Sequence, residues 1–600
     1  MSATFNPFSF GELEAAVATT ESQREVWLAA LYGDDANCGF NESINVQLSG
    51  ALNYTALEAA LKDLVRRHQS LRGCFSGDGK QMVFYRERAI PLVRHDLRGQ
   101  SSADAEQRLK LLSEAVVSKP FDLYQGPLAR FDLVVHSTTE HRLILSFHHA
   151  ICDGWSLYVL AEELGTLYSQ HCGLAVEALP PAPCFADYAL WERAGEFQAL
   201  HRSSVDYWLK RFAAGVPNLE LPYDNARPAQ RTFAAKRWDT DLPMPLIAGL
   251  KKLAAGNKST LMSTLMAGFV VYLNRWSGAT QIVLGVPFAG QMAKGDGGLV
   301  GHCVNIIPLY FELTGSETFS QVIALCQTAM LEAFDNQYLT YGTLLQHLDT
   351  ARDPSKPPLV SVIFNLDQQG PPSEAYQGLS CAFGSNPRLF ENFDLNINIT
   401  LASDHAEIEA TYNLGLWRLP TMQRRMREYV ALYETLVAQP NLALPEIELI
   451  LPDDLAMIRA SWQKDLRPYP LKDVSLHGLI EAAVDLYPNH TALVVGDQQL
   501  SYKQLDEMAN RLAHFLIQQG VGPEQLVPIM LERSFEMVIA INAVLKAGAA
   551  YLPLDPEHPA DRIEYIVHEA GARWVLTTEA FVGKLPADVV IDLTTEARPG

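Results

Sequence analysis

The segment from residue 142 to residue 168 changes from one apolar pattern to another. Residues 142–147 (RLILSF) are short, apolar and rich in strand formers, which predicts a buried strand. After a turn at Asp153-Gly154, apolar residues recur at helical spacing, at Leu157, Leu160, Leu164, Leu167 and Tyr168. The pattern predicts a strand, a connection and a helix, with His148 and His149 in the connection. Functional residues concentrate in such connections.

Side-chain alternation along this strand separates the two histidine rings. If pairing persists to the end of the strand, one face carries His149 with Leu143, Leu145 and Phe147, and the other carries His148 with Ile144 and Ser146. Only one of the two rings can therefore face a given cavity.

Two other segments have helical patterns. Thr55-x-x-Glu58 forms a capping box, followed by an apolar stripe that predicts a scaffold helix carrying Arg67 and His68. The apolar run at 261–273 is broken by polar residues and is too short to span a bilayer, so it predicts a buried helix.

The last part of the chain has a different organisation. Residues 451–472 contain three prolines and scattered charges, which predicts a linker between domains. Beyond it, strands at 491–495 and 574–576 alternate with a helix near 562–569 and with a helix whose apolar positions are Leu505, Met508, Leu512 and Phe515. Alternating strands and helices predict a parallel, wound α/β sheet.

Composition narrows the function classes. The net charge of −22 argues against nucleic acid as a partner, because phosphate contacts dominate that affinity. Eight cysteines show no C-x-x-C spacing, so reduced thiols are expected, and Cys152 is interpreted as a packing residue. Residues 1–10 lack the pattern of a signal peptide. These features predict a cytoplasmic protein with no membrane partner and with enough apolar residues, 48%, for several cores.

The two histidines are the main candidates for chemistry. An isolated His-His pair is more often buried and satisfied by the backbone than catalytic. However, His-His, a three-residue gap and Asp-Gly arise by chance on the order of once in a thousand chains of this composition. An imidazole has an unperturbed pKa near 6.5, so one of these rings is suited to proton transfer at neutral pH.

This histidine motif resembles the active-site motif of the condensation domains of nonribosomal peptide synthetases, which are similar to chloramphenicol acetyltransferase. Further segments resemble motifs of that family in the expected order over roughly residues 15–450, namely 20–27 (TESQREVW), 67–75 (RHQSLRGCF), 185–191 (FADYALW), 300–309 (VGHCVNIIPL) and 352–359 (RDPSKPPL). The resemblance implies an α/β condensation domain over 1–450, with an N-lobe at about 15–178 and a C-lobe at about 200–450 around a tunnel.

Several of these segments have structural interpretations too. The aromatic residues Phe185, Tyr188 and Trp191 have a spacing that is more often core than ligand contact. Asn305 is interpreted either as a satisfied buried amide or as a donor near the reacting centre.

The resemblance implies amide formation between two carrier-bound substrates. The amine of an aminoacyl group on a downstream peptidyl carrier attacks the acyl thioester on an upstream acyl or peptidyl carrier, both held on phosphopantetheine arms. His149 matches the second motif histidine and either takes a proton or orients the amine. His148, Asp153 and Gly154 belong to the same motif, with His148 and Asp153 structural. No metal and no cofactor bound by this chain are expected.

Four more residues are expected to bind substrate or line the tunnel: Trp155, Ser156, Gln291 and Asn305. The family often places an arginine after a Pro-x-x-Gly turn to pair with the motif aspartate. Here residues 287–290 (PFAG) are followed by Gln291, a neutral candidate partner for Asp153. Gln291 and the 301–305 segment resemble members that take acyl chains from polyketide-type partners.

A second resemblance begins after the predicted linker. Residues 500–505 (LSYKQL) and 545–555 (LKAGAAYLPLD) are similar to the first two motifs of amino-acid-activating adenylation domains. We interpret 473–600 as the truncated N-terminal part of such a domain. The family's phosphate loop does not occur in it, so ATP and Mg²⁺ are expected only in a full-length adenylation domain, and adenylation activity is not expected here. The rest of that domain is an expected partner.

Two alternatives remain at this point. One is an acyltransferase of the same superfamily that uses soluble acyl-CoA, or an epimerizing relative. The other is a non-catalytic docking module with the same fold, a class that usually lacks the complete histidine pattern.

Overall fold

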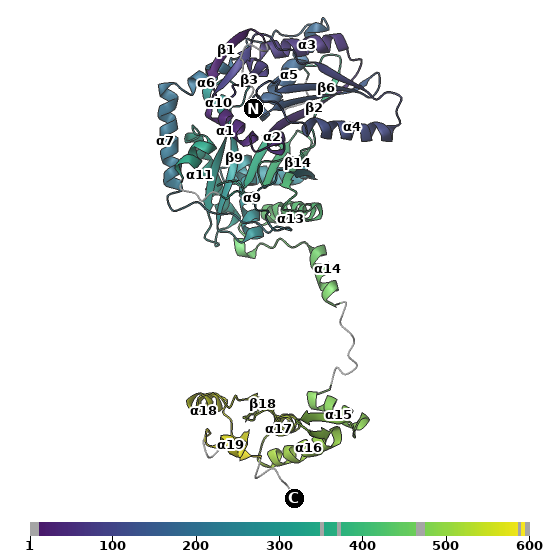
Figure 1. The fold of residues 1–600 in the computed structure, drawn as a ribbon, viewed down its shortest axis with the longest axis vertical. Coiled ribbons are helices and arrows are strands. Elements are labelled where there is room, and N and C mark those ends of the chain that lie inside the picture. Colours follow the sequence, from purple (N-terminus) through teal and green to yellow (C-terminus); the bar gives the residue numbers. More distant parts are fainter. Residues whose placement is uncertain (1–10, 349–352, 369–373, 464–473, 586–589, 594–600) are drawn as a thin grey trace. The chain divides into compact units, whose positions relative to one another are not determined.

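The structure, a computed structural model, describes residues 11–348, 353–368, 374–463, 474–585 and 590–593. The chain divides into two compact units, Met1–Ile458 and Arg459–Gly600, which we describe separately (Figure 1). Within the segment predicted as a linker, helix α14 spans Pro452–Gln463, and residues 464–473 lie outside the described part. In the described residues, we find no helix that is both long and apolar enough to cross a membrane.

The first half of unit 1 is built on a five-stranded sheet, in the order β12-β2-β7-β6-β5, and a smaller sheet, β1-β4-β3. Strand β12 (Ser380–Ser385) comes from far along the sequence and pairs antiparallel with β2. Residues 380–385 of the lobe predicted at 200–450 therefore belong to the sheet of the first half. The elements of this half are β1 (Leu13–Ala18), α1 (Glu21–Ala30), α2 (Asp34–Cys38), β2 (Asn41–Ser49), α3 (Tyr54–Arg67), β3 (Gly73–Phe75), β4 (Gln81–Tyr85), β5 (Leu92–Asp96), α4 (Ser102–Val117), β6 (Ala129–Val135), β7 (Glu140–His148), α5 (Gly154–His171), α6 (Phe185–Trp191) and α7 (Gly195–Arg211).

The predicted strand, connection and helix are confirmed as β7, residues 149–153 and α5. Alternation along β7 also holds for the apolar residues. Leu143, Leu145 and Phe147 belong to the core cluster that includes α3 and α5, whereas Ile144 packs with residues of α4 on the opposite face. His148 is the last residue of this strand and not part of the connection as predicted, whereas His149 follows the strand. Because the strand is covered on both faces, its end is held in place.

The second half of unit 1 contains a six-stranded mixed sheet in the order β10-β9-β11-β13-β14-β8. Helix α9 is the predicted buried helix, since 13 of its 17 residues are buried against the sheet and neighbouring helices. The elements are β8 (Ala235–Asp241), α8 (Met244–Gly256), α9 (Leu261–Ser277), β9 (Gln281–Ala289), α10 (Gly290–Lys294), β10 (Val304–Glu312), α11 (Phe319–Asp335), α12 (Tyr341–His347), β11 (Val362–Gln368), β13 (Leu395–Leu401), β14 (Ala406–Asn413) and α13 (Leu419–Ala438).

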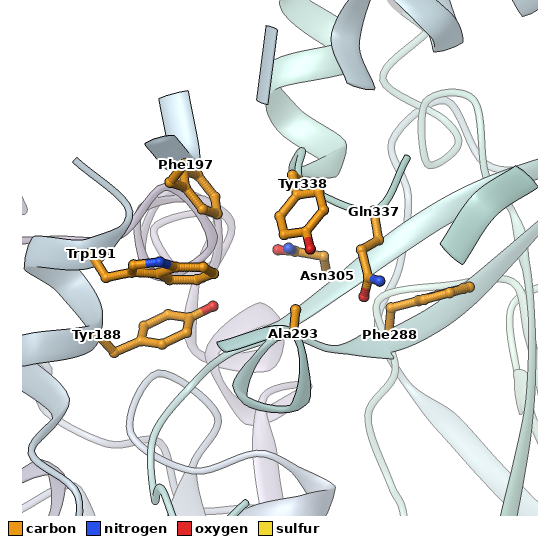
Figure 2. A pocket seen from close by; sticks show the side chains of 9 residues that line it. Tyr188, Trp191, Phe197, Phe288, Ala293, Asn305, Gln337 and Tyr338 are labelled. Atoms are coloured by element: carbon orange, nitrogen blue, oxygen red, sulfur yellow. The ribbon is translucent and has the colours of Figure 1, made fainter. Parts of the chain in front are cut away.

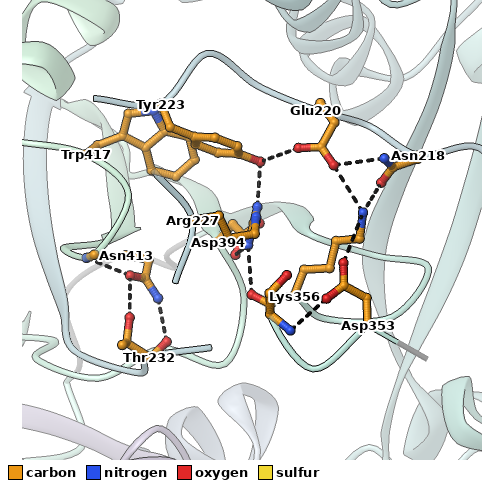
Figure 3. Close-up of polar contacts among 12 residues, drawn as sticks. Asn218, Glu220, Tyr223, Arg227, Thr232, Asp353, Lys356, Asp394, Asn413 and Trp417 are labelled. Atoms are coloured by element: carbon orange, nitrogen blue, oxygen red, sulfur yellow. Dashed lines mark hydrogen bonds and ion pairs between the residues drawn. The ribbon is translucent and has the colours of Figure 1, made fainter. Parts of the chain in front are cut away.

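A polar network fastens the segment after α7 to loops of this second half (Figure 3). Arg227 forms an ion pair with Asp394 at 2.6 Å, and Lys356 forms one with Glu220 at 3.1 Å. Lys356 belongs to the motif at 352–359, of which Arg352 lies outside the described residues. The described part of that motif therefore has a structural role in joining the connecting segment to the second half.

The predicted capping box of α3 is wrong. The side chain of Asn53 accepts a hydrogen bond from the backbone of Ala56 at 3.1 Å, so the helix begins one residue before Thr55. Asparagine caps a helix at least as well as threonine, which explains the earlier start. The scaffold role is supported by Arg67 and His68, which both contact Glu163 of α5 at 2.7 Å.

Unit 2 contains a hairpin and a parallel four-stranded sheet in the order β18-β17-β19-β20, which confirms the predicted wound α/β sheet. Helix α16 buries Leu505 and Leu512 as predicted, but Met508 is 37% exposed and Leu516 is buried in its place. The elements are α15 (Leu476–Leu486), β15 (Thr491–Val495), β16 (Gln498–Ser501), α16 (Tyr502–Gln518), β17 (Leu526–Ile529), α17 (Phe535–Lys546), β18 (Ala550–Pro553), α18 (Ala560–Glu569), β19 (Val575–Thr577), α19 (Glu579–Val582) and β20 (Val590–Asp592).

Candidate active site

His148 is a fully buried residue at the end of β7. Its Nδ1 accepts a hydrogen bond from the backbone of Ala150 at 3.2 Å, and its ring packs between Phe40 and Phe121. Burial, with smaller contributions from His149 and Arg130, lowers the pKa of His148 to about 3. A ring that stays neutral and enclosed fixes the end of the strand and does not exchange protons with a substrate.

Asp153 caps helix α5 and joins it to the second half of unit 1. Its carboxylate accepts hydrogen bonds from the backbone and hydroxyl of Ser156 at 2.9 and 2.7 Å and from the backbone of Cys303 at 3.1 Å. The amide of Gln291, in the first turn of α10, donates to both carboxylate oxygens at 3.2 Å. Gln291, the neutral partner that the sequence predicts for Asp153, is therefore in contact with it. In all of these contacts the Asp153 carboxylate is the acceptor.

The next residues of the motif have different surroundings. Gly154 begins α5 with open space where a Cβ would lie. Trp155 is 42% exposed, and its indole donates to the backbone of Gly297 at 2.7 Å. Ser156 is buried, and its hydroxyl oxygen accepts from the backbone N–H of Gly301 at 3.0 Å. The carbonyl of Gly301, also at 3.0 Å, is the alternative to Asp153 as acceptor for the single hydroxyl hydrogen. Ser156 and the buried Gln291 thus lie inside the network that joins the two halves, not on an open wall as expected for tunnel residues.

His149 lies where the two halves of unit 1 meet. Its backbone donates to the carbonyl of Phe40 at 2.8 Å, and its side chain is 20% exposed. Nδ1 of the ring lies 3.0 Å from Nδ1 of His302, and the two rings meet edge to face at 89°. His149 is therefore the motif histidine whose ring reaches solvent, whereas His148 is fully buried.

A carboxylate faces the other nitrogen of His149. Oε1 of Glu42, on β2, lies 3.7 Å from Nε2 of His149 and 2.7 Å from the guanidinium of Arg388. Burial alone would raise the pKa of Glu42, but Arg388 and His149 hold that pKa below its usual value. Glu42 is therefore an anion held beside the open nitrogen.

Sequence reasoning did not single out Glu42, Arg388 or His302 as site residues. His302 is 153 residues from His149 in the chain and lies within the motif at 300–309, in which Asn305 was the predicted site residue. No local pattern identifies these three residues, because they meet only when β2, the segment before β13 and the start of β10 come together. Among the described residues, no group of three or more histidine, cysteine or acidic side chains is arranged to hold a metal ion.

Asn305 lines a pocket at the junction of the two halves (Figure 2). Figure 2 shows the rings of Tyr188, Trp191 and Phe197 on one side and Asn305, Gln337 and Tyr338 on the other. Tyr188 is buried, and Trp191 is half-buried and packs edge to face on Phe197 at 4.7 Å. The aromatic residues of this motif are thus mainly core, as predicted, although two of them also line the pocket.

We expect Glu192, which follows Trp191, to make stability depend on pH. Burial raises its pKa to about 8 from an ordinary 4.5. The folded state therefore holds a proton that the unfolded state loses, so this stability is complete below pH 4.5 and is lost as the pH rises through 8. Each unit of pKa difference corresponds to about 1.4 kcal/mol. The melting temperature of the neutral variant Glu192→Gln minus that of the wild type should therefore increase as the pH rises from about 5 to about 9. Parallel melting curves across this range would contradict the assignment.

Comparison with known proteins gives two family matches. Residues 14–458 match the family described as Condensation domain, and residues 480–598 match the family described as AMP-binding enzyme. Bacitracin synthase 2 from Bacillus licheniformis is 31% identical over 92% of this chain, and gramicidin S synthase 2 from Brevibacillus brevis is 31% identical over 94%. The chain spans only 21% and 12% of the length of these two relatives.

Solved structures agree with this fold. A four-domain nonribosomal peptide synthetase bound to AMP and glycine matches 98% of the chain with a TM-score of 0.76 and 20% identity, and this chain covers 45% of it. The first condensation domain of the calcium-dependent antibiotic synthetase, in complex with a substrate analogue, matches 73% of the chain with a TM-score of 0.65 and 20% identity, and this chain covers all of it. The two-part interpretation of the sequence is confirmed at the level of family and fold.

Proposed function

From its site we propose that this chain, which belongs to the condensation-domain family, forms amide bonds in a nonribosomal peptide or hybrid polyketide/peptide assembly line. After the condensation domain the chain continues into the start of an AMP-binding enzyme domain. The observation that carries the proposal is His149, a partly exposed imidazole at the end of a covered strand, with Glu42 3.7 Å from its open nitrogen. In the docking-module alternative, nothing would require a titratable ring and an ionised carboxylate at this junction.

The proposed reaction joins an acyl group to an amine. The nitrogen of an aminoacyl group on a downstream carrier attacks the thioester carbonyl of an acyl group on an upstream carrier. The new C–N bond forms, the C–S bond breaks, and the proton lost by the nitrogen goes to the departing thiolate of the upstream phosphopantetheine. The phosphopantetheine arms belong to the carriers, and ATP and Mg²⁺ would serve only a complete adenylation domain.

His149 and its surroundings supply two effects. Holding the amine and the thioester in one geometry can lower the barrier by roughly 7 to 11 kcal/mol, since it replaces a bimolecular encounter. A positioned imidazole that takes the amine proton adds typically about 10²- to 10⁴-fold in rate. Glu42 stabilises the imidazolium that forms when His149 takes this proton.

The test uses the full chain with two loaded carriers, one with an acyl group and one with an amino acid. Intact-protein mass spectrometry should show the acyl-aminoacyl product on the downstream carrier. A parallel reaction replaces the upstream carrier with the same acyl group on coenzyme A. Product only from the carrier supports the proposal, equal product from coenzyme A favours the acyl-CoA alternative, and no product from either donor favours the docking module.

A further inference from the structure

The ring of His302 contacts the ring of His149. The two Nδ1 atoms are 3.0 Å apart, a hydrogen-bond distance, and the ring centroids are 4.8 Å apart. Both atoms cannot donate and both cannot accept, because a hydrogen bond needs one N–H and one lone pair. The protonation of His302 therefore decides which nitrogen of His149 carries hydrogen.

His302 is held neutral. Its side chain is buried, and burial followed by the neighbouring His149 and His148 lowers the pKa of His302 well below its usual value. A hydrogen bond with the backbone of Ser22 opposes this by favouring the protonated ring, as expected when a ring N–H donates to a carbonyl. Since Nδ1 of His302 faces His149, Nε2 is the nitrogen left to donate to the carbonyl of Ser22. A neutral His302 that donates from Nε2 has an unprotonated Nδ1, which is an acceptor.

The consequence for His149 follows directly. An acceptor at Nδ1 of His302 requires His149 to donate from its own Nδ1, which leaves Nε2 of neutral His149 with a free lone pair. Nε2 faces Oε1 of Glu42 at 3.7 Å, too far for a direct hydrogen bond, and Glu42 is itself held by Arg388. The free lone pair therefore lies beside an anion that favours the arrival of a positively charged amine.

We infer that His302 is a positioning residue that fixes the orientation and tautomer of His149, so that Nε2 meets the substrate amine. This inference rests on the proposed function for its catalytic consequence, but the arrangement of protons exists in the resting protein. The arrangement resembles the logic of a catalytic triad, in which a third group orients the imidazole. Here the orienting group is a neutral imidazole, and the stabilising carboxylate lies on the opposite side of the ring.

The first experiment measures the tautomer. The full chain is labelled with ¹⁵N in its histidine rings, and the His149 signals are assigned by their loss in His149→Asn. At a pH where the ring is neutral, Nδ1 of His149 should show the shift and coupling of a protonated nitrogen and Nε2 those of an unprotonated one. The reverse pattern in the wild-type chain would overturn the inference whether or not the chain makes product.

The second experiment separates positioning from folding. His302→Leu removes the acceptor but keeps apolar bulk, and it should lower kcat by about 10²-fold with little change in KM for the acceptor carrier. His302→Gln keeps an acceptor and should recover a substantial part of that kcat, with both melting temperatures measured. An unchanged kcat in His302→Leu, or equal loss of kcat in both variants, would overturn the inference. Failure of the wild-type chain to make amide would instead refute the proposed function and leave the tautomer measurement to decide the role of His302.

Discussion

His149→Ala is expected to lower the rate of amide formation by about 10²- to 10⁴-fold, the range that a positioned general base contributes. The ring is only partly enclosed, and its backbone hydrogen bond to Phe40 does not depend on the side chain. The variant should therefore fold normally. Single-turnover assays with both loaded carriers, followed by intact-protein mass spectrometry, measure the rate.

His405→Ala is the matched control. His405 is 57% exposed and contacts Asp404 at the surface, so its loss should leave the rate at the wild-type level. Normal product from a folded His149→Ala variant would remove His149 from the chemistry and leave positioning of the two carriers as the whole of catalysis.

Asp153→Ala is expected to have the largest effect on stability. The substitution removes the acceptor for three buried donors: the backbone N–H groups of Ser156 and Cys303 and the amide of Gln291. The hydroxyl of Ser156 also loses Asp153, but it can donate to the carbonyl of Gly301 at 3.0 Å instead. A buried donor left without a partner costs about 1 to 3 kcal/mol, and the lost helix cap adds about 1 kcal/mol. Two of these donors, Gln291 and Cys303, come from the second half of unit 1, so calorimetry should show a clear fall in melting temperature together with lost activity.

Asp153→Asn separates charge from hydrogen bonding at the same position. The asparagine keeps one oxygen for Ser156, and Gln291 has a buried carbonyl oxygen without a partner that can rotate to accept from the new amide. Cys303 loses its acceptor, so the variant should be less stable than the wild type but more stable and more active than Asp153→Ala. Equal, complete loss of activity in both variants at unchanged melting temperature would show that the negative charge itself is needed.

The sequence alone predicted the elements that depend on neighbours within a few residues. The strand before the histidines follows from a short apolar run of strand formers, and the helix after Asp153 follows from apolar residues at helical spacing; the structure confirms both. The strand at 491–495 has the predicted bounds for the same reason. Local patterns failed where two residues competed for one position, since Asn53 caps α3 instead of Thr55. They also failed where tertiary contacts decide which face of a helix is buried, since α16 buries Leu516 while Met508 remains exposed.

Only the tertiary structure decided how the site is completed. The sequence determined that His148, His149 and Asp153 lie together, because they are within six residues of one another at the junction of a strand and a helix. Glu42, Arg388 and His302 come from distant segments, and β12 crosses into a sheet formed mostly from the first 150 residues. Contacts between residues far apart in the sequence depend on how the chain closes long loops and on which faces of its elements become buried. No periodicity or spacing in the sequence predicts such contacts. The surroundings that keep His148 buried and neutral and leave His149 partly exposed beside Glu42 are therefore a property of the folded chain.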